Sequence, residues 1–314
     1  MKSEKDIVYW IALAHLSGWN TQFINQIIHS ILFEKKMSFE EFFALKPEEY
    51  CRLFGLSDVH SAELEQAKAE LPNNGFLAEY LHAQGFAVIP FTDDSYPVLL
   101  KKNIEKSHPV VLYVKGNTQL LNEKSAAIIG SRNALNISLE FTARMAKRLT
   151  EEHKVIVSGF ARGVDRKALD EAIAAGGQSI IVLPQGVLTF SSGMKKYYRH
   201  IVSGDLLVLS TFHPRAAWSI PLAMARNRYI FGLAEEIYVS QSGESGGTWA
   251  GVLDGLRRGR QVFVRAPDAV ESNGNNLLLQ KGAVPVDMDG NVLESLKKDS
   301  AEELRKSVQY ELFD

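Results

Sequence analysis

Residues 126–132 read Ala-Ala-Ile-Ile-Gly-Ser-Arg, and residues 155–165 read Val-Ile-Val-Ser-Gly-Phe-Ala-Arg-Gly-Val-Asp. In each stretch a short apolar run, typical of a buried strand, ends in a turn that carries an arginine and leads into a helical pattern. The carboxyl ends of neighbouring parallel strands share one crevice, and ligands bind there. The first N–H groups of the helices that follow attract anions. The sequence therefore predicts two adjacent anion-binding turns, with Arg132 and Arg162 beside them, and a ligand that carries phosphate.

Further short apolar runs extend this pattern in both directions. Helical stretches of roughly 10–15 residues separate most of them, which is typical of βαβ units in a parallel sheet with helices on both faces. The sequence thus predicts a doubly wound, mostly parallel α/β domain over residues 86–290. The expected strands are 86–90, 110–114, 126–129, 155–157, 179–183, 206–209, 236–240 and 261–264.

Residues 1–85 read instead as a helical domain. Apolar residues recur at helical spacing, Ser38 with Glu41 forms a capping box, and Pro47 opens a further short helix. A charged helix is expected to stop near residues 72–75, which read Pro-Asn-Asn-Gly. Residues 291–314 are predicted as a C-terminal tail with one charged helix.

Composition limits the possible classes of protein. The chain has 314 residues, a length comfortable for two domains, and its formal net charge is −2. The single cysteine, Cys51, excludes an internal disulfide, is expected to be a core thiol and fits a reducing cytoplasm. No apolar run approaches the ~20 residues of a membrane span, and we expect no signal peptide. Near-neutral charge counts mildly against a nucleic-acid binder, but a local basic patch can still bind because salt screens distant charges.

The basic stretch at residues 195–200 has two interpretations. Lys195, Lys196 and Arg199 alternate with Tyr197 and Tyr198, and aromatic residues among cations suit single-stranded nucleic acid. A solvated helix with two packing tyrosines explains the same residues equally well.

Residues 226–228, Arg-Asn-Arg, form a second basic cluster. A helix would send Arg226 and Tyr229 to one side and Arg228 to another, and a buried ion pair is a serious alternative for one of the arginines. The glycine-rich loop at residues 243–248 can form a nest of N–H groups for an anion.

Several chemistries are missing from the sequence. It has no P-loop, no strict G-x-G-x-x-G, no H-E-x-x-H and no cysteine cluster, and no Ser/His/Asp set can be defended. We therefore expect no metal, no cofactor and no catalysis.

Five motifs in order resemble the DNA-processing protein A (DprA/Smf) family. They lie at residues 95–117, 129–132, 158–165, 226–233 and 274–283. The chain departs from the family pattern at Leu169, where the family commonly has histidine, at Ser210-Thr211, where it has Ser-Glu, and in residues 245–248 and 264–268. No winged-helix segment is expected after residue 289, so the chain is identified as a divergent member.

This resemblance implies an extended Rossmann-like fold behind a helical, SAM-like N-terminal domain. It also implies single-stranded DNA binding without catalysis, usually by a homodimer that loads a RecA-type recombinase during DNA uptake and recombination. Together with the residue patterns it gives the candidate DNA-binding residues Gly130, Ser131, Arg132, Ser158, Gly159, Arg162, Gly163, Lys195, Lys196, Arg199, Arg226, Asn227, Arg228, Gly246, Gly247 and Thr248.

Two alternatives stay open. A nucleotide-processing enzyme related to the LOG phosphoribohydrolases would share Gly246-Gly247-Thr248, but Gly251 stands where that group has its catalytic glutamate. A paralogue could also use the same groove to sense foreign DNA or nucleotide signals in defence.

Overall fold

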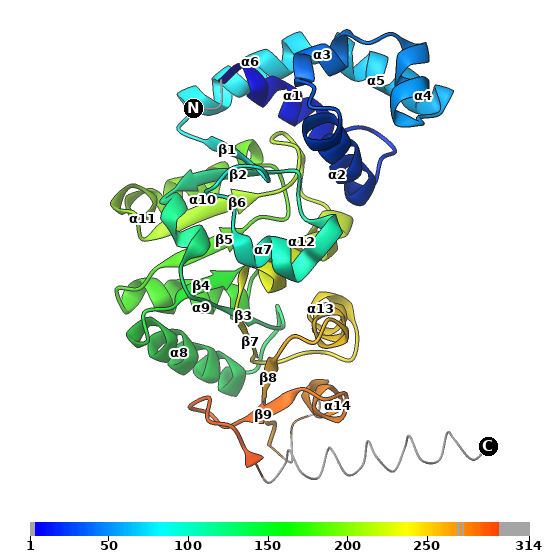
Figure 1. Cartoon of the computed structure of the whole chain (residues 1–314). Coiled ribbons are helices and arrows are strands. Elements are labelled where there is room, and N and C mark those ends of the chain that lie inside the picture. The colour runs from blue at the N-terminus through cyan, green and yellow to red at the C-terminus, as the bar shows by residue number, and fades with distance from the viewer. Residues whose placement is uncertain (1–3, 269–270, 272, 295–314) are drawn as a thin grey trace, which may run out of the picture. The chain divides into compact units, whose positions relative to one another are not determined.

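The computed structural model describes residues 4–268, 271 and 273–294, and the chain forms two compact units (Figure 1). The first unit combines Met1–Tyr96 with Ile104–Lys115, and the second combines Pro97–Asn103 with Gly116–Asp314. Most of the expected C-terminal helical tail, residues 295–314, lies outside the described residues.

Helices make up most of the first unit. The capping box is confirmed, because the Ser38 hydroxyl accepts the Glu41 N–H at 3.1 Å and the Glu41 carboxylate accepts the Ser38 N–H at 2.7 Å. Cys51 is half-buried rather than in the core, with its Sγ 3.4 Å from the Ser61 hydroxyl. The helices are α1 (Glu4–Ala14), α2 (Thr21–His29), the π-helical turn Ser30–Glu34, α3 (Phe39–Ala44), α4 (Pro47–Phe54), α5 (Asp58–Ala69) and α6 (Leu71–Ala83).

The expected stop at residues 72–75 is wrong in detail. Helix α5 already ends at Ala69, and α6 begins at Leu71 and continues through Pro72 and Gly75. Proline lacks an N–H and has a fixed φ, so it fits the first turn of a helix as well as a break after one. Pro72 therefore marks the start of α6.

An antiparallel pair, β1 (Ala87–Pro90) and β2 (Val111–Gly116), lies mainly among the residues of the first unit. Side-chain hydrogen bonds connect this strand pair to the helices of the first unit. The Asn25 amide on α2 donates to the carbonyl oxygens of Lys106 at 3.1 Å and His108 at 2.9 Å, just before β2.

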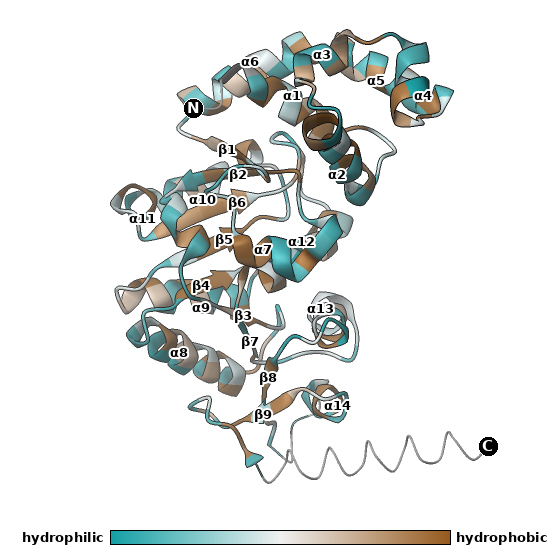
Figure 2. Ribbon diagram, viewed as in Figure 1, coloured by the Kyte–Doolittle hydropathy of each residue, from teal (hydrophilic) through white to brown (hydrophobic). Residues whose placement is uncertain are grey.

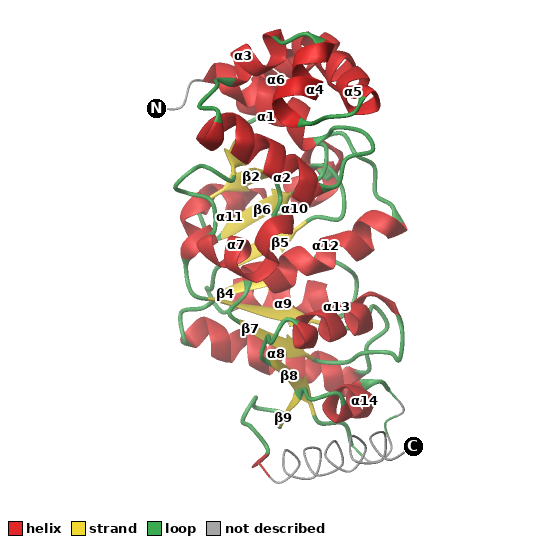
Figure 3. Cartoon of the chain, turned by 45° about the vertical axis from the view of Figure 1, so that its right-hand side comes forward, coloured by secondary structure: helices red, strands yellow, loops and turns green. Residues whose placement is uncertain are grey.

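The second unit contains a parallel sheet in the order β6-β5-β4-β3-β7-β8-β9. Helices α8 (Asn136–Glu151) and α9 (Val164–Ala174) cover one face, and α12 (Ile220–Leu233), α13 (Gly246–Arg257) and α14 (Asn275–Gln280) cover the other (Figures 1 and 3). The doubly wound fold is confirmed. The strands are β3 (Ser125–Ile129), β4 (Val155–Ser158), β5 (Ser179–Val182), β6 (Leu206–Ser210), β7 (Glu236–Val239), β8 (Val262–Arg265) and β9 (Val284–Val286), and the shorter helices are α7 (Val98–Ile104), α10 (Ser191–Lys196) and α11 (Tyr198–Ser203).

Strands buried on both faces explain why apolar runs predict this sheet. Each of the eight expected strands is present within one or two residues of its expected bounds. Figure 2 shows hydrophobic residues along the strands and hydrophilic residues on the outer side of helices such as α8. The sequence missed β9, because three residues with a central proline, Val284-Pro285-Val286, carry too little pattern.

The strand order places a topological switch point between β3 and β7. The chain runs outward from β3 through β4 and β5 to β6, then returns along α12 and adds β7 on the other side of β3. Ligands of open α/β sheets bind outside the carboxyl ends of strands at such a point.

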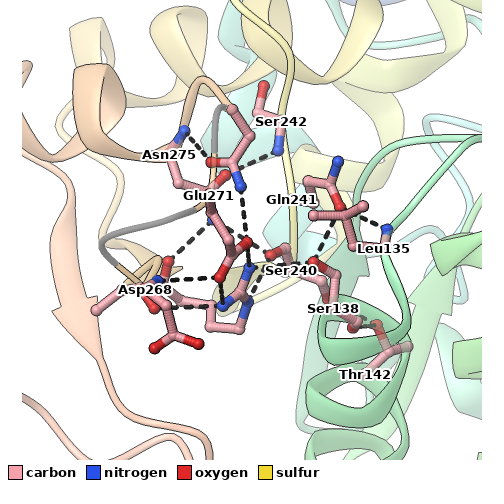
Figure 4. Close-up of polar contacts among 12 residues, drawn as sticks. Leu135, Ser138, Thr142, Ser240, Gln241, Ser242, Asp268, Glu271 and Asn275 are labelled. Carbon is pink, nitrogen blue, oxygen red and sulfur yellow. Dashed lines mark hydrogen bonds and ion pairs between the residues drawn. The ribbon is translucent and has the colours of Figure 1, made fainter.

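A buried polar network supports the sheet beside this point (Figure 4). Arg265, at the end of β8, is only 1% exposed and forms an ion pair of 2.5 Å with Glu271. It also donates to the Ser240 carbonyl at 3.1 Å and to the Ser138 hydroxyl at 3.1 Å. Asn275 donates to the carbonyl oxygens of Ser240 at 3.2 Å and Arg265 at 2.9 Å. In the sequence, residues 264–268 stand out only as a departure from the family pattern. In the structure, Arg265 in this stretch connects β8 to the end of β7 and to α8 by hydrogen bonds.

The network predicts an acid-sensitive contribution to stability. Hydrogen bonds from Arg265 hold the pKa of Glu271 below its ordinary value. A lowered carboxylate pKa stabilises the fold above the unfolded-state pKa of about 4.3, and this contribution disappears as pH falls through the folded-state pKa. We expect Glu271→Gln to lower the free energy of unfolding at pH 7 and the difference from wild type to shrink in acid. Urea unfolding of both proteins across this pH range measures it, and a difference that grows in acid would contradict the assignment.

Candidate nucleic-acid interface

Two adjoining cavities lie in the second unit along the carboxyl ends of its strands. The first, of about 400 Å³, has Ile220, Met224 and Phe231 among its apolar walls. The second, of about 390 Å³, includes Phe160 and Trp218. Both cavities are lined by Arg132, Ala161 and Arg226, so we call them together the groove.

The turn after β3 brings an exposed cation to both cavities. The Ser131 N–H donates to the Gln241 carbonyl at 2.9 Å, which ties this turn to the end of β7. Arg132 is exposed and forms no salt bridge within residues 4–268, 271 and 273–294. Its guanidinium carbon lies 5.9 Å from the centre of the Trp218 ring. Arg132 is thus available to an anion in the groove.

The expectation of two empty anion-binding turns needs correction, because the protein supplies its own anion. The buried carboxyl group of Asp165 accepts hydrogen bonds from the backbone N–H groups of Gly130, Gly159 and Ala161. Burial raises the pKa of Asp165, against the opposing effects of Arg226 and these N–H groups. The two turns therefore close on Asp165, and an external phosphate would meet the arginine side chains rather than these three N–H groups.

The sequence allows a buried ion pair for one arginine of residues 226–228, and Arg226 is that residue. It is 4% exposed, donates to the Val182 carbonyl at 3.0 Å, and lies 3.9 Å from the Asp165 carboxylate. Burial lowers its pKa. Gly159 makes the space, since a Cβ at that position would lie 1.4 Å from Nη1 of Arg226. Arg226 lines the groove but is held by the protein.

More than half of the candidate residues meet in the groove. Arg162 is exposed and donates to the Asn133 side chain at the rim of the second cavity. Those lining one or both cavities are Gly130, Ser131, Arg132, Gly159, Arg162, Arg226, Asn227, Gly247 and Thr248.

Other candidates lie outside the lining of the two cavities, and their contacts support the fold. Ser158 is buried and donates to the Ile128 carbonyl at 2.9 Å. Gly163 has φ of +84°, and a Cβ there would lie 2.4 Å from the Ser131 carbonyl oxygen, so it lets the two turns pack. Arg228 donates to the Tyr229 hydroxyl at 2.6 Å and lines neither cavity.

The basic stretch around α10 and α11 also lies outside the groove lining. Tyr197 is buried and donates to Asp170 at 2.5 Å, and Lys196 lies 3.8 Å from the same carboxylate. The packing interpretation therefore holds for Tyr197. Lys195 and Arg199 are exposed, but neither lines either of the two cavities of the groove.

The start of α13 borders the first cavity. Ser245 makes no side-chain capping bond there, Gly246 has φ of +90°, and Gly247 and Thr248 line the cavity. Gly251 packs against Phe231, where a Cβ would come within 2.8 Å of the ring. A catalytic glutamate at residue 251 would therefore not fit without moving Phe231.

Sequence reasoning missed the apolar and aromatic part of the groove. Trp218, Ile220 and Met224 are 48%, 68% and 43% exposed, and they flank the start of α12. Trp218 lies in the loop before α12, and Ile220 and Met224 lie within its first five residues, a stretch too short for a periodic pattern to show which residues face a ligand.

Comparison with known proteins identifies the family. A model of the family described as DNA recombination-mediator protein A matches residues 87–297. The chain belongs to this family. It is 32% identical over 215 residues to DNA processing protein DprA of Streptococcus pneumoniae, covering 67% of this chain and 74% of that protein. It is 29% identical over 262 residues to DNA processing protein DprA of Bacillus subtilis, covering 79% and 80%.

Solved structures agree with this placement. The Streptococcus pneumoniae DprA structure matches with a TM-score of 0.71 at 26% identity over 90% of this chain and 94% of that one. A Helicobacter pylori DNA processing protein A structure, which concerns a single-stranded DNA binding mode, matches with a TM-score of 0.56 at 25% identity over 70% and 96%. The family and fold expected from the sequence are confirmed. Within the described part of the chain, no helix is both long and apolar enough to cross a bilayer.

Proposed function

We propose that the groove binds single-stranded DNA through its phosphates and bases and performs no chemistry on it. The observation that carries this proposal is the exposed Arg132, which has no ion-pair partner among the described residues and lines two cavities at the switch point of the sheet. Family membership and the single-stranded DNA binding of the Helicobacter pylori relative support the choice of ligand.

The groove residues favour binding over catalysis. Asp165 is the carboxylate among the residues that line the two cavities, and it is already engaged by three N–H groups and Arg226. A carboxylate can act as a general base only when it is free to reach and accept the proton that it removes. Glycine at position 251 likewise argues against the LOG-type alternative.

A protein with almost no net charge can still bind a polyanion if cations are concentrated at the binding site. Salt screens charges beyond about 8–10 Å, so a strand in the groove responds to nearby arginines rather than to the net charge of −2. If about six phosphates are contacted, affinity for oligo-dT should fall by roughly 300-fold between 50 and 200 mM salt.

Arg132→Ala tests the proposal. We expect about a tenfold or greater loss of affinity for oligo-dT, because a hydrogen bond to a charged group contributes about 1.5–3 kcal/mol. The slope of log affinity against log salt should fall by about 1. Fluorescence anisotropy with labelled oligo-dT over a salt series measures both.

Arg257→Ala is the matched control. Its side chain is 77% exposed in the last turn of α13, away from the residues that line the groove. Equal losses in the two variants would mean that the attraction is diffuse, and the groove would not be the DNA site. Release of free base from nucleoside monophosphates by the wild-type protein would replace the binding function with an enzymatic one.

We further propose that the protein acts in the cytoplasm as a homodimer that loads a RecA-type recombinase onto bound DNA during natural transformation. The family description as a recombination mediator supports this role. Light scattering gives the oligomeric state, and recombinase filament formation on protein-coated single strands tests the loading.

A further inference from the structure

Trp218 combines wide exposure with a defined partner. It lies between β6 and α12, is 48% exposed, and lines the second cavity. Its ring approaches the guanidinium of Arg132 at 5.9 Å, within the range of a cation–π contact. A large aromatic ring is therefore held at the wall of the groove with about half of its surface open.

The remaining aromatic residues of the second cavity have packing partners. Phe160 and Phe190 meet edge-to-face at 4.8 Å between ring centres. Arg166 places its guanidinium carbon 3.6 Å from the Phe160 ring centre. Phe160 itself adopts a left-handed backbone with φ of +63°, which is costly for a bulky residue and directs it into this cluster. Phe160 and Phe190 thus form a packed wall, whereas Trp218 keeps an open surface.

We propose that Trp218 is a nucleobase-stacking residue, on which a base of the bound strand stacks inside the second cavity. This inference rests on the proposed DNA-binding function. One nucleotide carries a phosphate and a flat heterocycle side by side, and Arg132 with Trp218 offers a matching cation and flat ring.

The size and chemistry of the second cavity fit a base. Its volume of about 390 Å³ lies within the range of about 300–1,000 Å³ typical of small-ligand sites. Pro184, Phe190 and Ala161 supply apolar lining, and Arg162 stands at the rim for a second phosphate. Every base has a π-face, so stacking on Trp218 adds affinity for any sequence.

The test separates stacking from phosphate binding. We compare an oligo-dT strand with a strand of the same length whose sugars are all abasic, using wild type, Trp218→Ala and Trp218→Phe. Trp218→Ala should lose about 5- to 150-fold in affinity for oligo-dT, the effect of losing one stacked base. Affinity for the abasic strand should stay unchanged, and Trp218→Phe should recover part of the loss.

Tyr80→Ala is the control for loss of an exposed aromatic ring, since Tyr80 is 50% exposed on α6 of the first unit. Thermal unfolding checks that each variant is folded. Equal losses on both strands would overturn the inference, because Trp218 would then act only by placing Arg132. An unchanged affinity for oligo-dT would overturn it as well, while leaving the DNA-binding function intact. Failure of wild type to bind either strand would remove the proposed function and the stacking role together.

Discussion

Replacing Arg265 with alanine is expected to lower the free energy of unfolding by about 3–5 kcal/mol, because it leaves the buried partner charge uncompensated. The Glu271 side chain is 6% exposed and would lose its 2.5 Å ion pair. The Ser138 hydroxyl and the Ser240 carbonyl would also lose a donor. These groups join β7, β8 and α8, so the carboxyl ends of the strands beside the groove would loosen. Urea unfolding followed by circular dichroism measures the change.

Arg258→Ala is the matched control. Arg258 forms an ion pair of 2.9 Å with Asp254, but its side chain is 44% exposed. Exposed pairs contribute about 0–1 kcal/mol, since water screens them. The double variant Arg265→Met with Glu271→Leu should lose less than Arg265→Ala, because no charge is left buried. If Arg265→Ala and Arg258→Ala prove equally stable, the network does not support the sheet.

The sheet could be predicted because its information is local. Each long strand is an apolar run bounded by turn residues, and the capping box at Ser38 depends on residues three apart. Pro72 was misassigned because the same residue fits a helix start and a helix stop. The β1–β2 pair is held to the helices of the first unit by contacts between residues far apart in the sequence, such as Asn25 with His108. No local sequence pattern predicts such contacts.

The groove was predictable in position but not in detail. Two strand-ending turns that share a crevice follow from the parallel order of the strands. The sequence does not predict that the Asp165 carboxylate occupies the place expected for a ligand anion. That outcome depends on how far this side chain reaches across both turns. Helical periodicity separated Arg226 from Arg228, yet only packing against β5 shows that Arg226 is the buried one. Trp218 lies where sequence carries no periodic signal.

Asp165→Ala is expected to lower the free energy of unfolding by about 3–5 kcal/mol and to abolish tight binding of oligo-dT. Breaking a buried pair leaves Arg226 as an uncompensated charge that is 4% exposed. The N–H groups of Gly130, Gly159 and Ala161 would lose their common acceptor, and the turn that carries Arg132 would keep its bond to Gln241 but lose this second contact. Chemical unfolding and anisotropy with oligo-dT measure the two effects.

Asp254→Ala, which removes a half-exposed carboxylate on α13, is the control and should change neither quantity by much. Asp165→Asn keeps the shape but offers one strong acceptor and adds an NH₂ facing backbone donors, so it should fall between wild type and Asp165→Ala. The internal carboxylate also makes a prediction about anions. Millimolar inorganic phosphate should raise the melting temperature of Asp165→Ala more than that of wild type, because only the variant has unoccupied N–H groups next to a buried arginine. An equal shift in both proteins would mean that these N–H groups do not form an anion cradle, and Asp165 would then act only through Arg226.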